Sequence, residues 1–232
     1  MRVILEPGFV LHATPYREAS MLVSFFTQHQ GKISGVVKGA RGLRPRYRGL
    51  VMPFSPLLIS FSGKTDLMQI TAIEPLAAAY ILKGNNVFNG LYLNELLLKL
   101  LPKQDAYPLL FSHYQTALQQ LQSEGCSPQI VLRTFEKNLL AELGYGLQLN
   151  QDAQGRLVSA NQYYTYHLEK GLVSLDNIPV TTGTHFLGSH LLAIEQNQFS
   201  TQEILMTAKR LMRLALRNLL GDRQLTTREL FT

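Results

Sequence analysis

Short runs of alternating hydrophobic and polar positions fill the first third of the chain. Five runs rich in β-branched and aromatic residues lie at 8–14, 21–27, 32–38, 53–61 and 66–73, separated by turn-forming residues. Leu57, Ile59 and Phe61 alternate onto one face of the fourth run, and Leu67 and Ile70 offer apolar anchors in the fifth. Five strands in about 70 residues predict a small closed barrel, because closure leaves no exposed sheet edge.

After Pro75 the hydrophobic spacing becomes helical. Leucines recur at three- and four-residue intervals, at positions 93, 96, 97, 100 and 101. A second helix is predicted over 107–123. A third is predicted to begin at Ser127-Pro128, a capping residue followed by proline, and to stop near Gly144.

The helical period is lost between residues 145 and 180. Tyrosines at 163, 164 and 166 and apolar residues at 172, 173 and 175 flank the turn at 169–171, which predicts a small β-hairpin insert. A last long helix is predicted from the capping sequence at 200–203 to Gly221. The predicted fold class is α+β, with a barrel domain over 1–79, a helical domain over 80–232, and the insert at about 146–180.

The positive charge of the chain is concentrated at one end. The first fifty residues carry eight Lys and Arg against two Glu, a net of 8 − 2 = +6, which equals the net charge of the whole 232-residue chain. A single-sign field on one small module is typical of a protein that meets a polyanion. The segment 38–49 is densest, with five cations, no acid and three glycines, and it is predicted to be a loop.

Candidate nucleic-acid contacts follow from this distribution. Cations neutralise phosphates and release counterions, and an aromatic side chain within a cationic loop offers a surface on which bases stack. The candidates in the barrel domain are Arg17, Lys32, Lys38, Arg41, Arg44, Arg46, Tyr47 and Arg48. A second, weaker set lies off the buried stripe of the last helix: Lys209, Arg210, Arg213 and Arg217.

Arg133 lies on the third predicted helix beside Leu132 and Phe135, with Lys137 one turn further on. An arginine at the rim of an apolar groove binds a carboxylate bidentately, whereas the alternative for Arg133 is a surface ion pair with Glu136 or with a neighbouring helix.

Signals for catalysis and for bound metal are weak. The chain contains no GxxxxGK[ST], HExxH or GxSxG motif, and its six histidines are scattered. The single cysteine, Cys126, excludes an internal disulfide and a cysteine-based zinc site within one chain. Apolar residues make up 46% of the chain, yet no segment approaches the roughly 20 apolar residues of a membrane span. We therefore expect a soluble cytoplasmic protein that is not an enzyme and holds no cofactor or metal.

Several blocks resemble the RecO family of bacterial DNA repair and recombination mediators. In chain order they are FVLH at 9–12, PYREAS at 15–20, VVKGAR at 36–41, PFSPL at 53–57, GLYLNEL at 90–96, LRTFE at 132–136, LGYG at 143–146, AKR at 208–210 and TRELF at 227–231. Each block is a modest signal, but their order and their spread over nearly the whole chain are specific.

The resemblance implies an N-terminal oligonucleotide-binding (OB) barrel and a helical domain with a small inserted module. It implies a nucleoid-associated protein that binds single- and double-stranded DNA, anneals complementary strands and, with RecR, helps to load RecA on DNA coated by the single-stranded DNA-binding protein SSB. It also implies that the acidic, phenylalanine-ended tail of SSB docks on the helical domain, with Arg133 and Lys137 as candidate contacts. Thr134 stands where some relatives carry a second arginine. Residues 146–180 lack the four cysteines with which some relatives bind zinc, so we expect no zinc here.

Two other functions remain open from the residues alone. An RNA-binding accessory factor could use the same barrel and basic loop, and a nucleic-acid-modifying enzyme could carry an unusual active site. Competition between RNA and single-stranded DNA separates the first from DNA repair, and turnover that depends on a histidine or an acid would identify the second.

Overall fold

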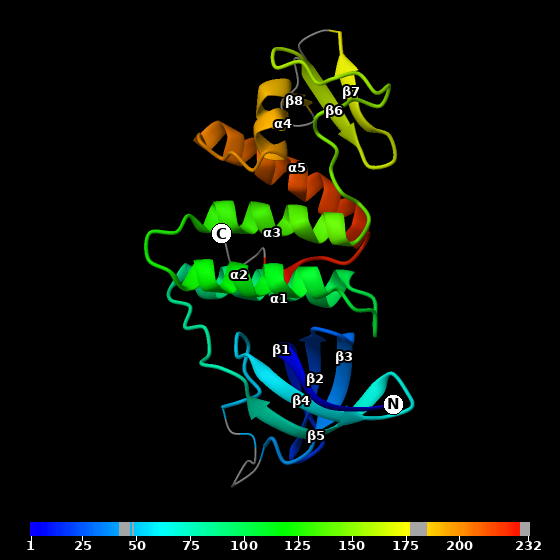
Figure 1. Ribbon diagram of the computed structural model, residues 1–232, viewed down its shortest axis with the longest axis vertical. Helices are drawn as coiled ribbons and strands as arrows, with labels where there is room; N and C mark the ends of the chain where they lie inside the picture. The colour runs from blue at the N-terminus through cyan, green and yellow to red at the C-terminus, as the bar shows by residue number, and fades with distance from the viewer. Residues whose placement is uncertain (42–46, 48, 177–184, 228–232) are drawn as a thin grey trace. The chain divides into compact units, whose positions relative to one another are not determined.

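In a computed structural model the chain forms two compact units (Figure 1). The structure describes residues 1–41, 47, 49–176 and 185–227. Unit 1 comprises Met1–Pro128 and the described part of Arg223–Thr232, and unit 2 comprises Gln129–Asp222. The domain boundary predicted at 79/80 lies inside unit 1, between its barrel and its first helix, and stays a prediction.

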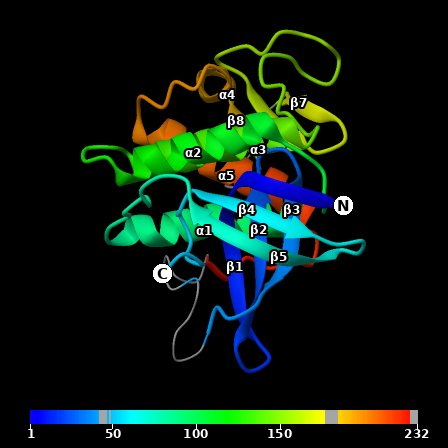
Figure 2. The same cartoon turned by 60° about the horizontal axis from the view of Figure 1, so that its bottom comes forward.

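Unit 1 contains the predicted five-stranded barrel, which confirms the α+β class (Figure 2). Its strands are β1 (Arg2–Tyr16), β2 (Ser20–Thr27), β3 (Gly31–Val37), β4 (Leu57–Ser62) and β5 (Leu67–Pro75). They close in the order β1-β2-β3-β5-β4, with β3 and β5 parallel and the other neighbours antiparallel. This is an OB-like barrel, whose closure leaves few strand edges open.

The barrel core follows the predicted alternation on β4 but not on β5. Leu57, Ile59 and Phe61 are all fully buried. On β5, however, Leu67 is 43% exposed and Met68 is buried beside Ile70. Residues three apart on a strand face opposite sides, so Leu67 and Ile70 cannot both point inward, and the prediction for Leu67 was wrong.

A buried amide connects the barrel to two helices of the same unit, α1 (Asn85–Leu100) and α2 (Pro108–Gln122). The strand register of β1 shifts between Val10 and His12, which leaves Leu11 in a bulge. Asn94 of α1 donates from Nδ2 to the carbonyls of Val10 and Leu11, both at 3.3 Å, and its Oδ1 accepts the hydroxyl of Tyr114 at 2.5 Å. One side chain thus satisfies the backbone groups that the bulge exposes.

Glu95, which follows Asn94 on α1, binds the C-terminal segment of the chain. The Glu95 carboxylate accepts hydrogen bonds from the backbone N–H and the hydroxyl of both Thr226 and Thr227, at 2.5–2.9 Å, and pairs with Lys99 at 2.7 Å. Burial alone would raise the pKa of Glu95, but these donors lower it to about 2. The segment is therefore fixed to α1 by an ionised carboxylate.

Unit 2 contains α3 (Pro128–Glu142) from its second residue on, a sheet of β6 (Tyr163–His167), β7 (Gly171–Leu175) and β8 (His185–Leu187), then α4 (Gly188–Glu195) and α5 (Gln202–Leu220). The predicted hairpin is β6–β7, and β8 adds a third strand beside β6. The hydroxyl of Thr201 caps α5 by accepting from Ile204 N at 3.3 Å. In the described part of the chain, every helix is too short or too polar to span a bilayer.

A buried aspartate organises the turn that precedes the small sheet. Asp152 accepts the backbone N–H groups of Gln154 and Arg156 on Oδ1, both at 2.9 Å, and Arg156 Nε on Oδ2 at 2.7 Å. Arg156 also reaches Ser174 of β7 at 2.8 Å. This network joins the turn to the hairpin by hydrogen bonds.

Candidate nucleic-acid interface

Three of the predicted cations lie together at one end of the barrel. Arg17 occupies the β1–β2 turn, and Lys38 and Arg41 directly follow β3, whose end pairs with the start of β2. The backbone N–H of Arg41 donates to Ala19 O of that turn at 3.0 Å. All three side chains are exposed, and the Arg17 guanidinium lies 5.2 Å from the centre of the Tyr16 ring. We call Arg17, Lys38 and Arg41 the barrel-end cations.

Arg44, Arg46 and Arg48 lie outside the described residues, and their roles stay predictions. Tyr47 between them is described, and it is not a surface ring: it is 7% exposed, belongs to the barrel core, and its hydroxyl donates to Thr71 O at 3.3 Å. A buried ring offers no face to a base, so the structure gives no support to the stacking role predicted for Tyr47.

Lys32 is separated from the barrel-end cations. It lies at the start of β3, six residues before Lys38, or about 20 Å along an extended strand. Its ammonium donates to Leu98 O at the C-terminal end of α1, at 2.7 Å. Burial and the like charges of Lys103 and Arg223 lower the pKa of Lys32. This cation satisfies the negative end of a helix in its own unit.

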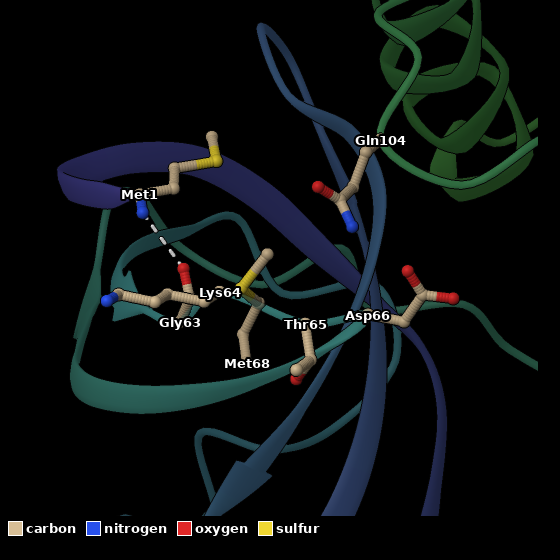
Figure 3. Close-up of a pocket in the computed structure, with 7 residues that line it drawn as sticks. All are labelled: Met1, Gly63, Lys64, Thr65, Asp66, Met68 and Gln104. Atoms are coloured by element: carbon tan, nitrogen blue, oxygen red, sulfur yellow. Dashed lines mark hydrogen bonds between the residues drawn. The ribbon is translucent and has the colours of Figure 1, made fainter.

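A polar hollow lies beside the β4–β5 turn and contains none of the predicted contacts (Figure 3). The N-terminal ammonium donates to Gly63 O at 2.9 Å, and Asp66 pairs with Lys103 at 2.8 Å. Its lining residues are Met1, Gly63, Lys64, Thr65, Asp66, Met68 and Gln104. Two of the charged groups at this hollow, the N-terminal ammonium and Asp66, thus have partners within the protein.

Arg133 is buried rather than exposed at a groove rim. Its Nη2 donates to Glu136 Oε1 at 2.8 Å, and both side chains are more than nine-tenths buried. The alternative of an ion pair with Glu136 therefore describes this structure, although the pair is buried and not on the surface. Arg133 Nε is also buried and has no hydrogen-bond partner among the described residues, which is costly for a donor.

Lys137 donates hydrogen bonds to the C-terminal end of α4. Its ammonium donates to Ile194 O at 3.0 Å, Glu195 O at 2.5 Å and Asn197 Oδ1 at 3.2 Å. Burial lowers the pKa of Lys137, and Glu195 opposes this shift. Three acceptors use all three donors of an ammonium, so Lys137 is placed as a structural residue.

The four cations predicted on the last helix are all exposed along α5: Lys209, Arg210, Arg213 and Arg217. The Arg210 guanidinium lies 5.6 Å from the centre of the buried Phe186 ring. Burial, Arg213 and Arg133 lower the pKa of Lys209, while Glu136 opposes them. The cationic row of α5 thus begins within electrostatic range of Arg133.

Groups suited to catalysis or metal binding are sparse. In the part of the chain that the structure describes, no three His, Cys, Asp or Glu residues lie close enough together to hold a metal ion. Burial raises the pKa of the Cys126 thiol, which disfavours the nucleophilic thiolate. Clusters of exposed cations, in contrast, occur at the barrel end and along α5.

Sequence reasoning found the cations but missed two buried polar residues of α1 that hold unit 1 together. Asn94 and Glu95 lie within an apolar helical pattern, and polar residues at such positions signal a buried network. That signal shows that a partner exists but does not name it, because the carbonyls that accept from Asn94 are 83 and 84 residues away in the chain and the threonines that donate to Glu95 are 131 and 132 residues away.

Comparison with known proteins covers nearly the whole chain. Residues 1–79 match the family model for the N-terminal part of recombination protein O, and residues 84–229 match that for its C-terminal part. The DNA repair protein RecO of Coxiella burnetii (strain RSA 331 / Henzerling II) is 41% identical over 231 residues, which are 99% of this chain and 98% of the relative. The DNA repair protein RecO of Pasteurella multocida (strain Pm70) is 40% identical over 239 residues, covering 100% and 97%.

Proposed function

Because the chain belongs to the RecO family of DNA repair proteins, we propose that it is a DNA-binding recombination mediator that anneals complementary single strands. It acts in the cytoplasm on nucleoid DNA, as a binding protein and not as an enzyme. With RecR as its partner, it helps RecA to replace SSB on single-stranded DNA.

The grouping of the barrel-end cations carries this proposal. Three exposed cations from two segments converge on one end of an OB-like barrel, and two of them, Lys38 and Arg41, begin the basic segment 38–49. Each cation that neutralises a phosphate releases counterions, and such contacts leave base edges free to pair. Binding of this kind has little sequence preference, as annealing of arbitrary complementary strands requires.

The Arg133 region supports a second element of the proposal, docking of the acidic SSB tail. Glu136 is a carboxylate already held by Arg133, and Arg133 Nε is a buried donor that an incoming carboxylate could satisfy. Lys209 lies within electrostatic range of both residues and is exposed. The tail would approach along Lys209 and compete with Glu136 for the Arg133 guanidinium.

The test is an annealing assay on complementary strands coated with SSB. The intact protein should accelerate annealing, and the variant Arg17→Gln/Lys38→Gln/Arg41→Gln should be slower by about tenfold or more. A matched variant, Lys64→Gln/Lys83→Gln/Lys170→Gln, removes three exposed cations elsewhere and should anneal within about twofold of the intact protein. Absence of annealing by the intact protein, or equal rates for both variants, would contradict the proposal. A strong preference for RNA in direct competition would favour the accessory-factor alternative.

A further inference from the structure

Three of the four exposed cations of α5 form a regularly spaced row, which we call the α5 row. Lys209, Arg213 and Arg217 are spaced by four residues, so neighbouring Cβ atoms are about 5–6 Å apart and the row is about 12 Å long. The opposite face of α5 is buried at Ala208, Leu211, Met212, Ala215 and Leu216. The apolar face therefore fixes the helix in unit 2 and directs the row toward solvent.

The charges of this row have little compensation. The one acid of α5 is Glu203, in the first turn, and a cation at i,i+4 from another cation destabilises a helix. Burial and the like charges of Arg213 and Arg133 lower the pKa of Lys209, and the carboxylate that opposes this shift, Glu136, is held by Arg133. A row of like charges that repel one another within a helix is typical of a surface that binds a polyanion.

The barrel-end cations and the α5 row belong to different compact units. Unit 2 is connected to unit 1 at two points in the chain, 128/129 and 222/223. Annealing needs two polyanions on one protein, and a strand bound at the barrel end repels a second strand there. A cationic surface on each unit gives each strand its own set of compensating charges.

We propose that the α5 row is a second polyanion-binding surface, which holds the second DNA strand while the barrel end holds the first. This inference rests on the proposed function and extends it, because it gives each unit one strand and makes a single chain sufficient for annealing.

The test uses two single strands of unrelated sequence, one with a donor dye and one with an acceptor dye, so that base pairing contributes no signal. The full-length protein should form a complex with both strands that gives energy transfer. Its mass should correspond to one 26.1 kDa chain and two strands. The variant Lys209→Gln/Arg213→Gln/Arg217→Gln keeps good helix formers on α5. It should bind the first strand within about twofold of the intact protein and the second at least about tenfold more weakly, and its annealing rate should fall accordingly.

The control is again Lys64→Gln/Lys83→Gln/Lys170→Gln, which has the same net charge of 6 − 3 = +3 and should bind both strands. The inference is overturned if the intact protein takes no second strand, or if the α5 variant takes it normally. It is also overturned if that variant loses only affinity for an acidic peptide ending in phenylalanine, since the row would then bind a protein tail. If the intact protein binds no first strand either, the proposed function itself fails.

Discussion

The hydroxyl of Tyr47 donates to the carbonyl of Thr71 on β5 while its ring packs in the barrel core. The backbone N–H of Leu50 in turn donates to Tyr47 O at 3.1 Å. Tyr47 lies within the basic segment 38–49, so that segment is attached to the barrel at an internal point as well as at its ends. Tyr47 is thus an anchor of the basic segment and not an exposed aromatic.

Substitutions at Tyr47 separate anchoring from base stacking. Tyr47→Leu keeps an apolar side chain in the core and should retain DNA affinity, whereas loss of a stacking ring would cost about 1–3 kcal/mol per base. Tyr47→Ala should lower the free energy of unfolding by about 3–5 kcal/mol and weaken DNA binding. Denaturant unfolding and fluorescence anisotropy measure the two effects. Ile73→Ala, a core change on β5, controls for destabilisation alone.

The salt dependence of single-strand binding counts the cations in contact with phosphates. Removing Arg17, Lys38 and Arg41 together should lower the slope of log K against log salt by about 2, since each contact contributes about 0.7 on a single strand. Removing Arg44, Arg46 and Arg48 as well should lower it further. The measurement is a set of binding isotherms at four or five salt concentrations, and an unchanged slope would exclude these cations from the interface.

The buried Arg133–Glu136 pair predicts opposite outcomes for single and double substitutions. Arg133→Met alone leaves Glu136 buried without its guanidinium and should cost about 3–5 kcal/mol of stability. Arg133→Met with Glu136→Leu should be close to neutral for stability and should abolish binding of an acidic, phenylalanine-ended peptide. Urea unfolding and peptide titration distinguish these effects. Full peptide affinity in the double variant would place the tail elsewhere.

The low pKa of Glu95 predicts that acid releases the C-terminal segment from α1. Its pKa is lowered from 4.5 to about 2, so its stabilisation is complete above about pH 4.5 and disappears as the pH falls through about 2. The full effect is about 3 kcal/mol. The hydrogen-exchange protection factors of the amides at 223–227, taken relative to the unfolded chain at the same pH, should fall across this range in the intact protein. In Glu95→Gln the same amides should exchange rapidly already at neutral pH.

The insert is predicted to be independent of metal. A chelator should leave the melting temperature unchanged, because Asp152 and Arg156 supply the cross-links of the turn. Asp152→Ala should expose the amides of Gln154 and Arg156 to exchange, whereas Asp152→Asn should keep part of their protection. A fall in melting temperature on chelation would reveal a metal site.

Periodicity predicted the elements, because a buried face repeats locally along the chain. The strand alternation at Leu57, Ile59 and Phe61 and the stripe of α5 are of this kind. Long-range polar contacts were not predictable in the same way. Lys32 and Lys137 are ordinary basic residues in sequence, and their acceptors lie 66 and 57–60 residues away. The α5 cap is the hydroxyl of Thr201, one residue beyond Ser200, although Ser200 and not Thr201 has a glutamate three residues further on.

The threonines that Glu95 binds come after all of unit 2 in the chain, although they complete unit 1. During synthesis on the ribosome, α1 therefore emerges long before the segment that packs on it. The barrel unit reaches its final hydrogen bonding only when unit 2 has been translated, so the N-terminal half of this protein matures last.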